Sequence, residues 1–197
     1  MRNLSGFIAQ IGKETHGWCG LGDDWNETIP NRIDWLRYQY ADFGRGRDAR
    51  GRKHNSPFFQ AASTLQKLLN PDQDPFGFMW LNLFVCDQAD HLPAADICER
   101  LRGVSFLRDE VRILKPHAVV FFTGSGRDDK GAYDYTITHP RYFPDAKINR
   151  VTNHLWSVVT GDDILPARTV RTYHPNYLWR HKQRGVLDEI ADGMQIA

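Results

Sequence analysis

Ala118-Val-Val-Phe-Phe-Thr123 decides the fold, because five apolar side chains follow one another before the first polar one. A short apolar run bounded by turn signals is typical of a strand that is buried on both faces of a parallel sheet. Lys115-Pro116 stops the helical pattern before the run, and Gly124-Ser125-Gly126 ends it. The sequence therefore predicts a buried parallel strand over residues 118–123.

Three other stretches have the composition of strands in the same sheet. Residues 6–11 (GFIAQI) are short and mostly apolar, and residues 78–85 (FMWLNLFV) are apolar except for Asn82. Residues 168–172 (RTVRT) give a fourth strand, which leads into polar residues. Such buried runs are expected where helices cover both faces of a sheet.

Segments with the helical spacing of apolar residues alternate with these strands. We expect helices over residues 33–40, from Ser56 onward, and over residues 96–114, 149–158 and 179–194. In the second of these, Ser56 is the expected N-cap and Pro57 suits the first helical position. Its apolar stripe consists of Phe58, Ala61, Leu65 and Leu68. The alternation predicts an α/β fold, a three-layer sandwich whose central, mostly parallel, four-stranded sheet has helices on both faces.

Length and composition predict a single domain over residues 1–197. A chain of 197 residues with 41% hydrophobic residues has the apolar mass for one substantial core. Its three cysteines are an odd number without a CxxC pair, which fits the reducing cytoplasm. No stretch approaches the roughly 18 apolar residues of a membrane span, and the N-terminus lacks the apolar region of a signal peptide. We expect a cytoplasmic monomer that does not contact membranes.

Polar residues gather where the predicted strands end. In open α/β sheets, ligands bind at the carboxyl ends of the strands. In this chain those ends hold Glu14, His16, residues 82–87, residues 124–126 and His174. We therefore expect the functional site at this edge of the sheet.

The run Thr172-Tyr-His-Pro-Asn-Tyr-Leu-Trp-Arg180 is similar to a motif that follows the last strand in the uracil-DNA glycosylase superfamily. The likeness is greatest to the TYHPxYLLR form of the bacterial thermostable branch. Residues 113–124 (ILKPHAVVFFTG) resemble the family's LKPKVIVALG strand, and residues 80–86 (WLNLFVC) resemble its YITNVVKC strand. These matches occur in family order, and with residues 11–17 the resemblance extends over residues 6–180.

Residues 11–17 (IGKETHG) stand where the family has its first motif, GQDPY or GMNPG, with Glu14 in the acidic or amide position. Thr15 follows Glu14 where the family has proline. The thermostable branch holds an iron-sulfur cluster on four cysteines, a set that this sequence does not have. We expect no cofactor and no metal.

The resemblance implies a DNA glycosylase, which flips a nucleotide out of the helix and cleaves its N-glycosidic bond. His174 would then donate a hydrogen bond to the departing base as that base gains charge. The alternative is a histidine that serves the turn before Pro175. Glu14 would orient the attacking water or stabilise the sugar cation, and the alternative is an exposed loop glutamate. His16 ranks second, as a substitute or helper.

Substrate-binding residues are expected around the flipped base. Asn82 can pair with the polar edge of a pyrimidine, although a buried asparagine can also tie loops together. Asp87 is expected to help shape the site. Phe58 and Trp18 are candidates for stacking on the base, and the alternative for each is a place in the core.

Cations are candidates for contacts with the phosphates of DNA, either single or double stranded. The expected DNA-binding residues are Arg45, Arg47, Arg50, Arg52, Lys53 and Arg180, and Arg171, Lys182 and Arg184 join them as further candidates. Solvated loop charge explains the group from Arg45 to Lys53 equally well.

The first hypothesis is a monofunctional glycosylase, with water as the nucleophile, that removes uracil or a modified pyrimidine. Hypermodified phage cytosine is one such base, and its removal would serve anti-phage defence. The second hypothesis is a nucleic-acid or nucleotide binding protein that keeps the fold without the chemistry. A small-molecule hydrolase on a similar sheet has only fold-level analogy behind it.

Overall fold

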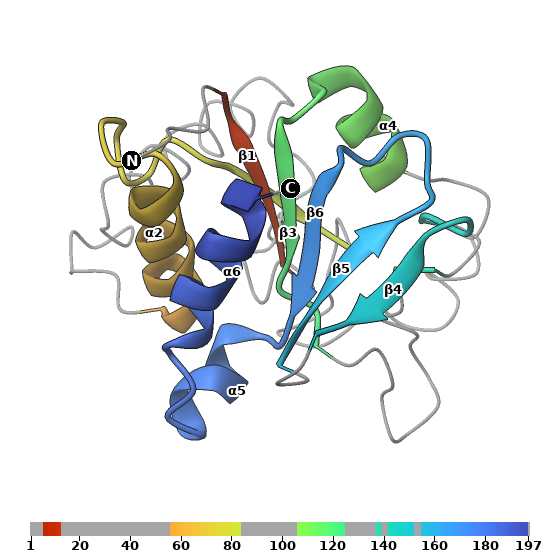
Figure 1. The fold of residues 1–197 in the computed structure, drawn as a ribbon. Coiled ribbons are helices and arrows are strands. Elements are labelled where there is room, and N and C mark those ends of the chain that lie inside the picture. The colour runs from red at the N-terminus through yellow and green to blue at the C-terminus, as the bar shows by residue number, and fades with distance from the viewer. Residues whose placement is uncertain are drawn as a thin grey trace, which may run out of the picture.

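Six strands form one sheet in the computed structural model, which describes residues 6–12, 56–83, 106–124, 137–138, 142–151 and 155–196. The strands are β1 (Ile8–Gly12), β2 (Met79–Asn82), β3 (Ala118–Phe121), β4 (Lys147–Arg150), β5 (Trp156–Thr160) and β6 (Arg168–Thr172). Their order across the sheet is β2-β1-β3-β6-β5-β4 (Figure 1). The first four in this order pair in parallel, and the last two are antiparallel to their neighbours.

The four stretches expected to be strands are strands of this sheet, but the sheet has six strands where four were expected. The middle strands β1 and β3 are buried at every position, which accounts for their nearly unbroken apolar sequences. The two additional strands, β4 and β5, extend the sheet beyond β6. The described chain is therefore α/β with a mostly parallel sheet.

The helix expected over residues 149–158 is wrong. The described residues of this stretch belong to the antiparallel pair β4 and β5, in which Asn149 lies opposite Val158. The segment from Val151 to Thr160 is rich in valine and threonine, whose branched side chains favour strands. β5 also pairs with the side of β6 that β3 leaves free, where Val158 lies opposite Val170. This pairing favours a strand, although the spacing of apolar residues in the segment suggested a helix.

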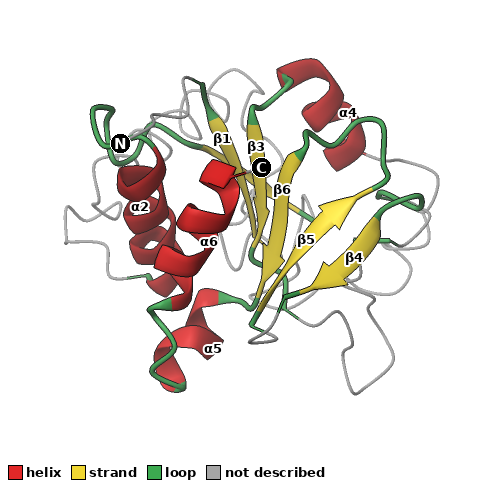
Figure 2. Cartoon of the chain, in the orientation of Figure 1, coloured by secondary structure: helices red, strands yellow, loops and turns green. Residues whose placement is uncertain are grey.

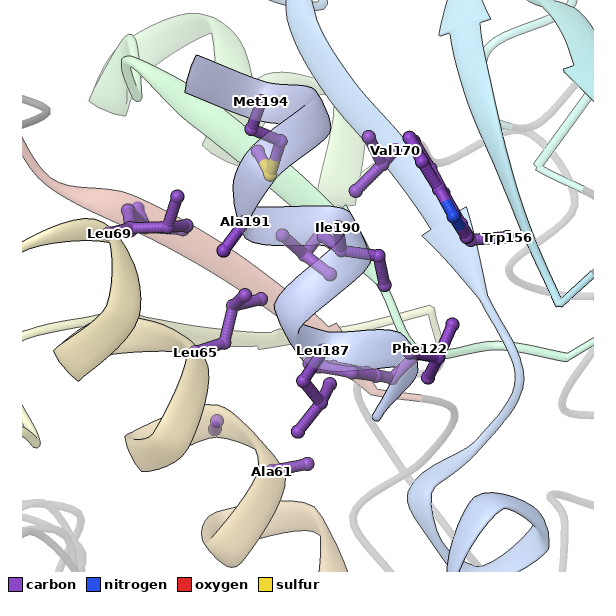
Figure 3. Close-up of a cluster of buried hydrophobic side chains, with 14 of the residues drawn as sticks. Ala61, Leu65, Leu69, Phe122, Trp156, Val170, Leu187, Ile190, Ala191 and Met194 are labelled. Carbon is purple, nitrogen blue, oxygen red and sulfur yellow. The ribbon is translucent and has the colours of Figure 1, made fainter. Parts of the chain in front are cut away.

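Four helices accompany the sheet in the described ranges: α2 (Pro57–Leu69), α4 (Phe106–Leu114), α5 (Pro175–Arg180) and α6 (Val186–Ile196). Helices α2 and α6 pack on one face, over Ile8, Val120 and Val170, as Figure 3 shows for part of this cluster. Helix α4 packs on the opposite face (Figure 2). Its Leu107 and Val111 belong to the core cluster on that side, with Ala9, Ile11, Val119 and Phe121 of the strands. Helices thus cover both faces of the sheet. None of the helices in the described part of the chain is both long and apolar enough to cross a bilayer.

Helix α2 begins where the sequence predicted, with Ser56 at the N-cap and proline in the first turn. The Ser56 hydroxyl makes no capping hydrogen bond, however. Phe58, Ala61 and Leu65 of the expected stripe are buried, while Leu68 is only partly buried. Leu69 takes the last core position in its place, with no exposed surface.

The other expected helices are described in part. The expectation of one helix over residues 179–194 is wrong, because α5 and α6 are separate and Lys182 between them has a left-handed backbone with φ of 55°. Of residues 96–114, the structure describes only those from Phe106 onward, and these form α4. The helix expected over residues 33–40 lies outside the described residues.

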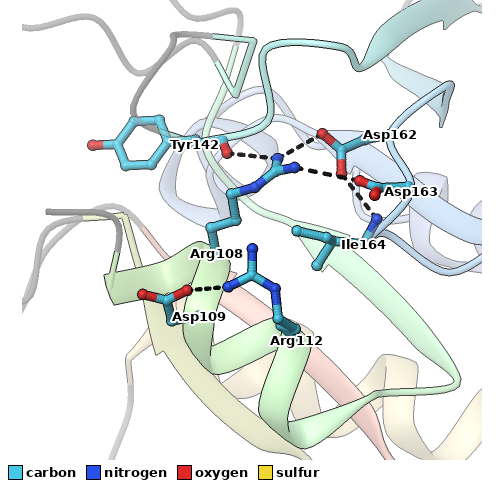
Figure 4. A network of polar contacts seen from close by, with 7 residues as sticks. All are labelled: Arg108, Asp109, Arg112, Tyr142, Asp162, Asp163 and Ile164. Carbon is cyan, nitrogen blue, oxygen red and sulfur yellow. Dashed lines mark hydrogen bonds and ion pairs between the residues drawn. The ribbon is translucent and has the colours of Figure 1, made fainter. Parts of the chain in front are cut away.

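A polar network joins α4 to the loop between β5 and β6 (Figure 4). The Arg108 guanidinium lies 2.8 Å from the Asp162 carboxylate and donates a hydrogen bond of 3.2 Å to the Tyr142 carbonyl. The other Asp162 oxygen accepts from the Ile164 backbone N–H at 3.0 Å. Because the Asp162 side chain has no exposed surface, this carboxylate depends on these partners for its solvation.

We expect Asp162→Ala to lower the free energy of unfolding by about 3 kcal/mol, since it leaves a largely buried guanidinium without its principal partner. The matched control is Asp163→Ala, whose carboxylate contacts the same guanidinium at 3.3 Å but is 86% exposed. The control should change stability by less than about 1 kcal/mol. Urea unfolding measures both variants, and equal losses would contradict the assignment.

Glu110 on α4 gives the stability a pH dependence, because burial raises the pKa of its carboxyl above the ordinary 4.5. A carboxyl with a raised pKa in the folded state contributes stability that is present below the unfolded pKa and is lost as pH rises through the folded pKa. Glu110→Gln should therefore be more stable than wild type at pH 7, and this advantage should disappear below about pH 4. Thermal unfolding at the two pH values tests the sign.

Candidate functional site

The carboxyl ends of β1 and β2 meet at one edge of the sheet. Gly12 and Asn82 are register partners at these ends. The Leu83 backbone N–H continues the pairing by donating to the Gly12 carbonyl at 3.0 Å. On the other side of β1, the Phe122 N–H donates to the Ile11 carbonyl at 2.8 Å. Residues that follow β2 and β3 thus start from fixed positions next to the end of β1.

The carboxyl ends of β3 and β6 complete this edge. The Gly124 N–H donates to the Thr172 carbonyl at 3.1 Å, so the chain leaves both strands at the same level. Gly124 has a φ of 77°, which is why a glycine stands at this turn. Tyr173 and His174 follow directly, and helix α5 begins at Pro175. Asn82 and His174 therefore lie at this edge of the sheet, where the sequence predicted them, and Gly124 lies at the same edge.

Asn82 is buried at this edge, with an exposed fraction of 9%. A Cβ atom on Gly12 would lie 2.7 Å from the Asn82 Oδ1 and 3.3 Å from the Phe58 Cε2. Only a glycine at position 12 leaves room for this amide. The Asn82 Oδ1 has no hydrogen-bond partner in the described part of the chain, and such an unpaired buried acceptor is costly. The oxygen is therefore covered by protein atoms and unpaired among the described residues, beside Gly12 and Phe58.

Phe58 is 7% exposed and packs among other aromatic rings. Its centroid lies 5.4 Å from that of Phe59, 5.8 Å from that of Trp80 and 5.7 Å from that of Phe122. This burial favours the core alternative for Phe58. Its Cε2 edge, beside Gly12 and Asn82, is the part of the ring that reaches the site.

His174 is the N-cap of α5 and is partly buried. Its Nδ1 accepts a hydrogen bond of 3.2 Å from the Asn176 backbone N–H. A neutral imidazole whose Nδ1 accepts carries its proton on Nε2. The local turn role and the catalytic role are thus compatible, because the capping contact orients the ring and selects the tautomer in which Nε2 is a donor.

The remaining predicted residues fall into two groups. Arg180 is exposed at the end of α5, as a phosphate-binding residue requires. The others lie outside the described residues, namely Glu14, His16, Trp18, Asp87, Arg45, Arg47, Arg50, Arg52 and Lys53. Their predicted roles remain predictions.

Thr123 is a polar residue near this edge that sequence reasoning did not assign to the site, and Arg171 was considered only as a surface phosphate contact. Arg171 is 8% exposed, and its Nε donates to the Thr123 hydroxyl at 3.4 Å. This burial argues against the surface phosphate contact considered from the sequence. The alternation of side chains along β6 could have indicated the burial of Arg171. Val170 belongs to the cluster under α6, so the next residue, Arg171, must point to the opposite face of the sheet.

The chain matches no protein-family model, and no curated protein or solved structure matches it either. Function is therefore inferred from the residues at the strand ends and from the sequence motifs. The described residues contain no group of three or more His, Cys, Asp or Glu side chains arranged to hold a metal ion.

Gly12→Ala tests the close approach of Asn82. The added methyl group would lie 2.7 Å from the Asn82 Oδ1, so we expect a loss of roughly 1–3 kcal/mol in the free energy of unfolding. Truncation of the neighbour should restore part of this loss in the double variant Gly12→Ala/Asn82→Ala.

The control for this prediction is Gly185→Ala, because a Cβ there meets nothing within 4 Å. That variant should be neutral or slightly more stable, since alanine reduces the freedom of the unfolded chain. Urea unfolding of wild type and of the single and double variants gives the coupling between positions 12 and 82. Additive losses in the double variant would exclude direct contact.

Proposed function

We propose that the chain is a monofunctional DNA glycosylase that hydrolyses the N-glycosidic bond of a flipped-out uracil or modified pyrimidine in DNA. The observation that carries the proposal is the hydrogen bond from the Asn176 N–H to the His174 Nδ1 at 3.2 Å. It leaves Nε2 as the donor nitrogen at the carboxyl end of β6, where ligands of open α/β sheets bind. Glycosidic cleavage needs such a donor beside the departing base.

The two described polar groups are complementary in their chemistry. Cleavage leaves a cation-like sugar and an anionic base, so the His174 Nε2–H donates to a base oxygen as that oxygen gains charge. Binding of the base would uncover the Asn82 Oδ1, which is covered and without a partner in the described ranges, so that it accepts from an N–H of the same base. β2 and β6 are three strand spacings apart, about 14 Å, which leaves room for a base between the two side chains.

An asparagine amide suits more than one pyrimidine. Its oxygen can accept from the ring N–H of uracil or from the exocyclic amine of a cytosine derivative, while its NH₂ donates to the adjacent acceptor. Asn82 therefore selects a pyrimidine edge and leaves the choice of base to other groups. The first motif, with Glu14 as the group that positions water or balances charge, is where we expect that choice to be made.

The parallel core supports the resemblance to the uracil-DNA glycosylase superfamily. The segments that resemble the family's motifs are strands β2, β1, β3 and β6, which are neighbours in that order. Asn82 is the last residue of β2, and His174 follows the carboxyl end of β6. This agreement between motif and position supports the assignment more than any one motif does.

Base release tests the proposal directly. Wild type should leave abasic sites in DNA that contains its base, and mass spectrometry of bases from plain, uracil-containing and hypermodified phage DNA should identify that base. His174→Ala should lower the rate about 10²- to 10³-fold, as expected for the loss of one donor to a developing anion. Asn176→Ala should retain the rate, because the capping N–H belongs to the backbone.

The proposal fails if wild type and the double variant Glu14→Gln/His174→Ala leave the same number of abasic sites on every DNA tested. Thr15, in place of the family's proline after Glu14, favours the second candidate, a binding protein without the chemistry. DNA retention by wild type without base release, unchanged in Glu14→Gln, would support that candidate.

A further inference from the structure

Three aromatic rings are stacked along helix α5. The centroids of Tyr173 and Tyr177 are 4.5 Å apart with their planes at 21°. The His181 centroid lies 4.2 Å from that of Tyr177, at an interplanar angle of 35°. Tyr177 and His181 are four residues apart, at α5 and its C-cap, so their side chains are neighbours on the helix surface. Tyr173 lies before the N-cap His174 and contacts Tyr177 from there. We refer to them as the Tyr173–His181 stack.

The outer end of this stack faces solvent. Tyr177 is 40% exposed, although it is a large aromatic residue, and His181 is also exposed. The ring of His181 contacts that of Tyr177, and the His181 side chain is otherwise exposed to solvent. Tyr173, at the inner end, is partly buried and packs against the core.

Positive charge surrounds the stack. Residues 173–185 contain no Asp or Glu, and their exposed cations are Arg180, Lys182 and Arg184. The Arg184 guanidinium lies over the Trp179 ring, 4.7 Å from its centroid. The Trp179 Nε1 donates to the Gln60 side-chain oxygen at 3.0 Å, which holds this pair against α2. A segment with three exposed cations and no acidic residue of its own is complementary to a polyanion.

We propose that the Tyr173–His181 stack and these three cations bind a single-stranded segment of DNA beside the base-excision site. An unpaired base stacks on the exposed ring of His181, and the neighbouring phosphates contact Arg180, Lys182 and Arg184. The proposal rests on the proposed function in taking DNA as the substrate, and it adds the preferred form of that DNA. Helical rise over the seven residues from His174 to His181 gives a separation of about 10 Å, within the reach of a few nucleotides.

The preference for single strands follows from the chemistry of stacking. The faces of a base in a duplex are covered by its neighbours, whereas an unpaired base can stack on an aromatic side chain. One such contact contributes about 1–3 kcal/mol, or roughly 5- to 150-fold in affinity. The phosphate contacts, by contrast, are available to both forms of DNA.

Fluorescence anisotropy with a labelled oligonucleotide, alone and in a duplex, tests the stacking contact. Wild type should bind the single strand more tightly than the duplex. His181→Ala should weaken single-strand binding at least ~5-fold and change duplex binding less, so that the preference decreases. His181→Phe should keep the preference. The control is His117→Ala, an exposed histidine directly before β3, at the amino-terminal end of the parallel strands.

The salt dependence tests the binding of phosphates. Because log K falls as log salt rises, the slope of log K against log salt is negative. The triple variant Arg180→Gln/Lys182→Gln/Arg184→Gln should reduce the size of this negative slope by about 2, since each phosphate of a single strand that a cation neutralises contributes roughly 0.7 to it. Lys67→Gln/Lys147→Gln/Arg150→Gln removes three exposed cations elsewhere and should leave the slope unchanged.

Parallel assays of base release separate this inference from the proposed function. If base release occurs but His181→Ala and the Arg180 triple variant bind both DNA forms as wild type does, the stack is not a DNA-binding surface and the glycosylase proposal stands. If these variants lose single-strand binding while wild type releases no base from any DNA, the binding surface stands and the glycosylase proposal fails.

Discussion

The parallel pairing of β1 with β3 is the interaction on which the rest of the described structure depends. Both strands are buried at every position, so their backbone N–H and C=O groups can be satisfied only by neighbouring strands. That requirement fixes the register, in which Ile11 lies opposite Phe121, and it fixes the level at which both strands end. β2 and β6 pair with the outer sides of these strands and end at the same edge, so four chain segments deliver their polar residues to one place.

The strands and the start of α5 hold the two described polar side chains of the candidate site in place. Asn82 is the last residue of β2, and its amide occupies space that the missing side chain of Gly12 leaves open. His174 is held at the start of α5 by a backbone hydrogen bond that also selects its tautomer. Groups positioned by regular elements keep their geometry when a ligand arrives, which lowers the reorganisation that catalysis would otherwise require. The same short helix carries His174 at one end and the exposed aromatic stack along its length, so base excision and strand binding would share one element.

The sequence predicted the parallel strands well, because burial on both faces leaves an apolar run that local composition reveals. It failed for residues 149–158, where β-branched residues and the edge of β6 produce a strand pair from a segment with helical spacing. It also failed to divide residues 179–194, since the break at Lys182 depends on a left-handed backbone that favours glycine and is here adopted by lysine. Asn82 was recognisable as the one polar residue in an apolar run, whereas the burial of Arg171 was not recognised before the strand's two faces were known.

By itself the sequence determined the α/β class, the parallel strands and the presence of Asn82 and His174 at strand ends, because these follow from periodicity and from short motifs. Only the tertiary structure decided what surrounds those residues. The Asn82 oxygen, unpaired among the described residues, lies against Gly12, which the pairing of β1 with β2 brings next to it. The exposure of Tyr177 and His181 likewise depends on which side of α5 meets the core, where Leu178 is fully buried. Hydrogen bonding and burial depend on neighbours distant in the chain, and local sequence does not specify them.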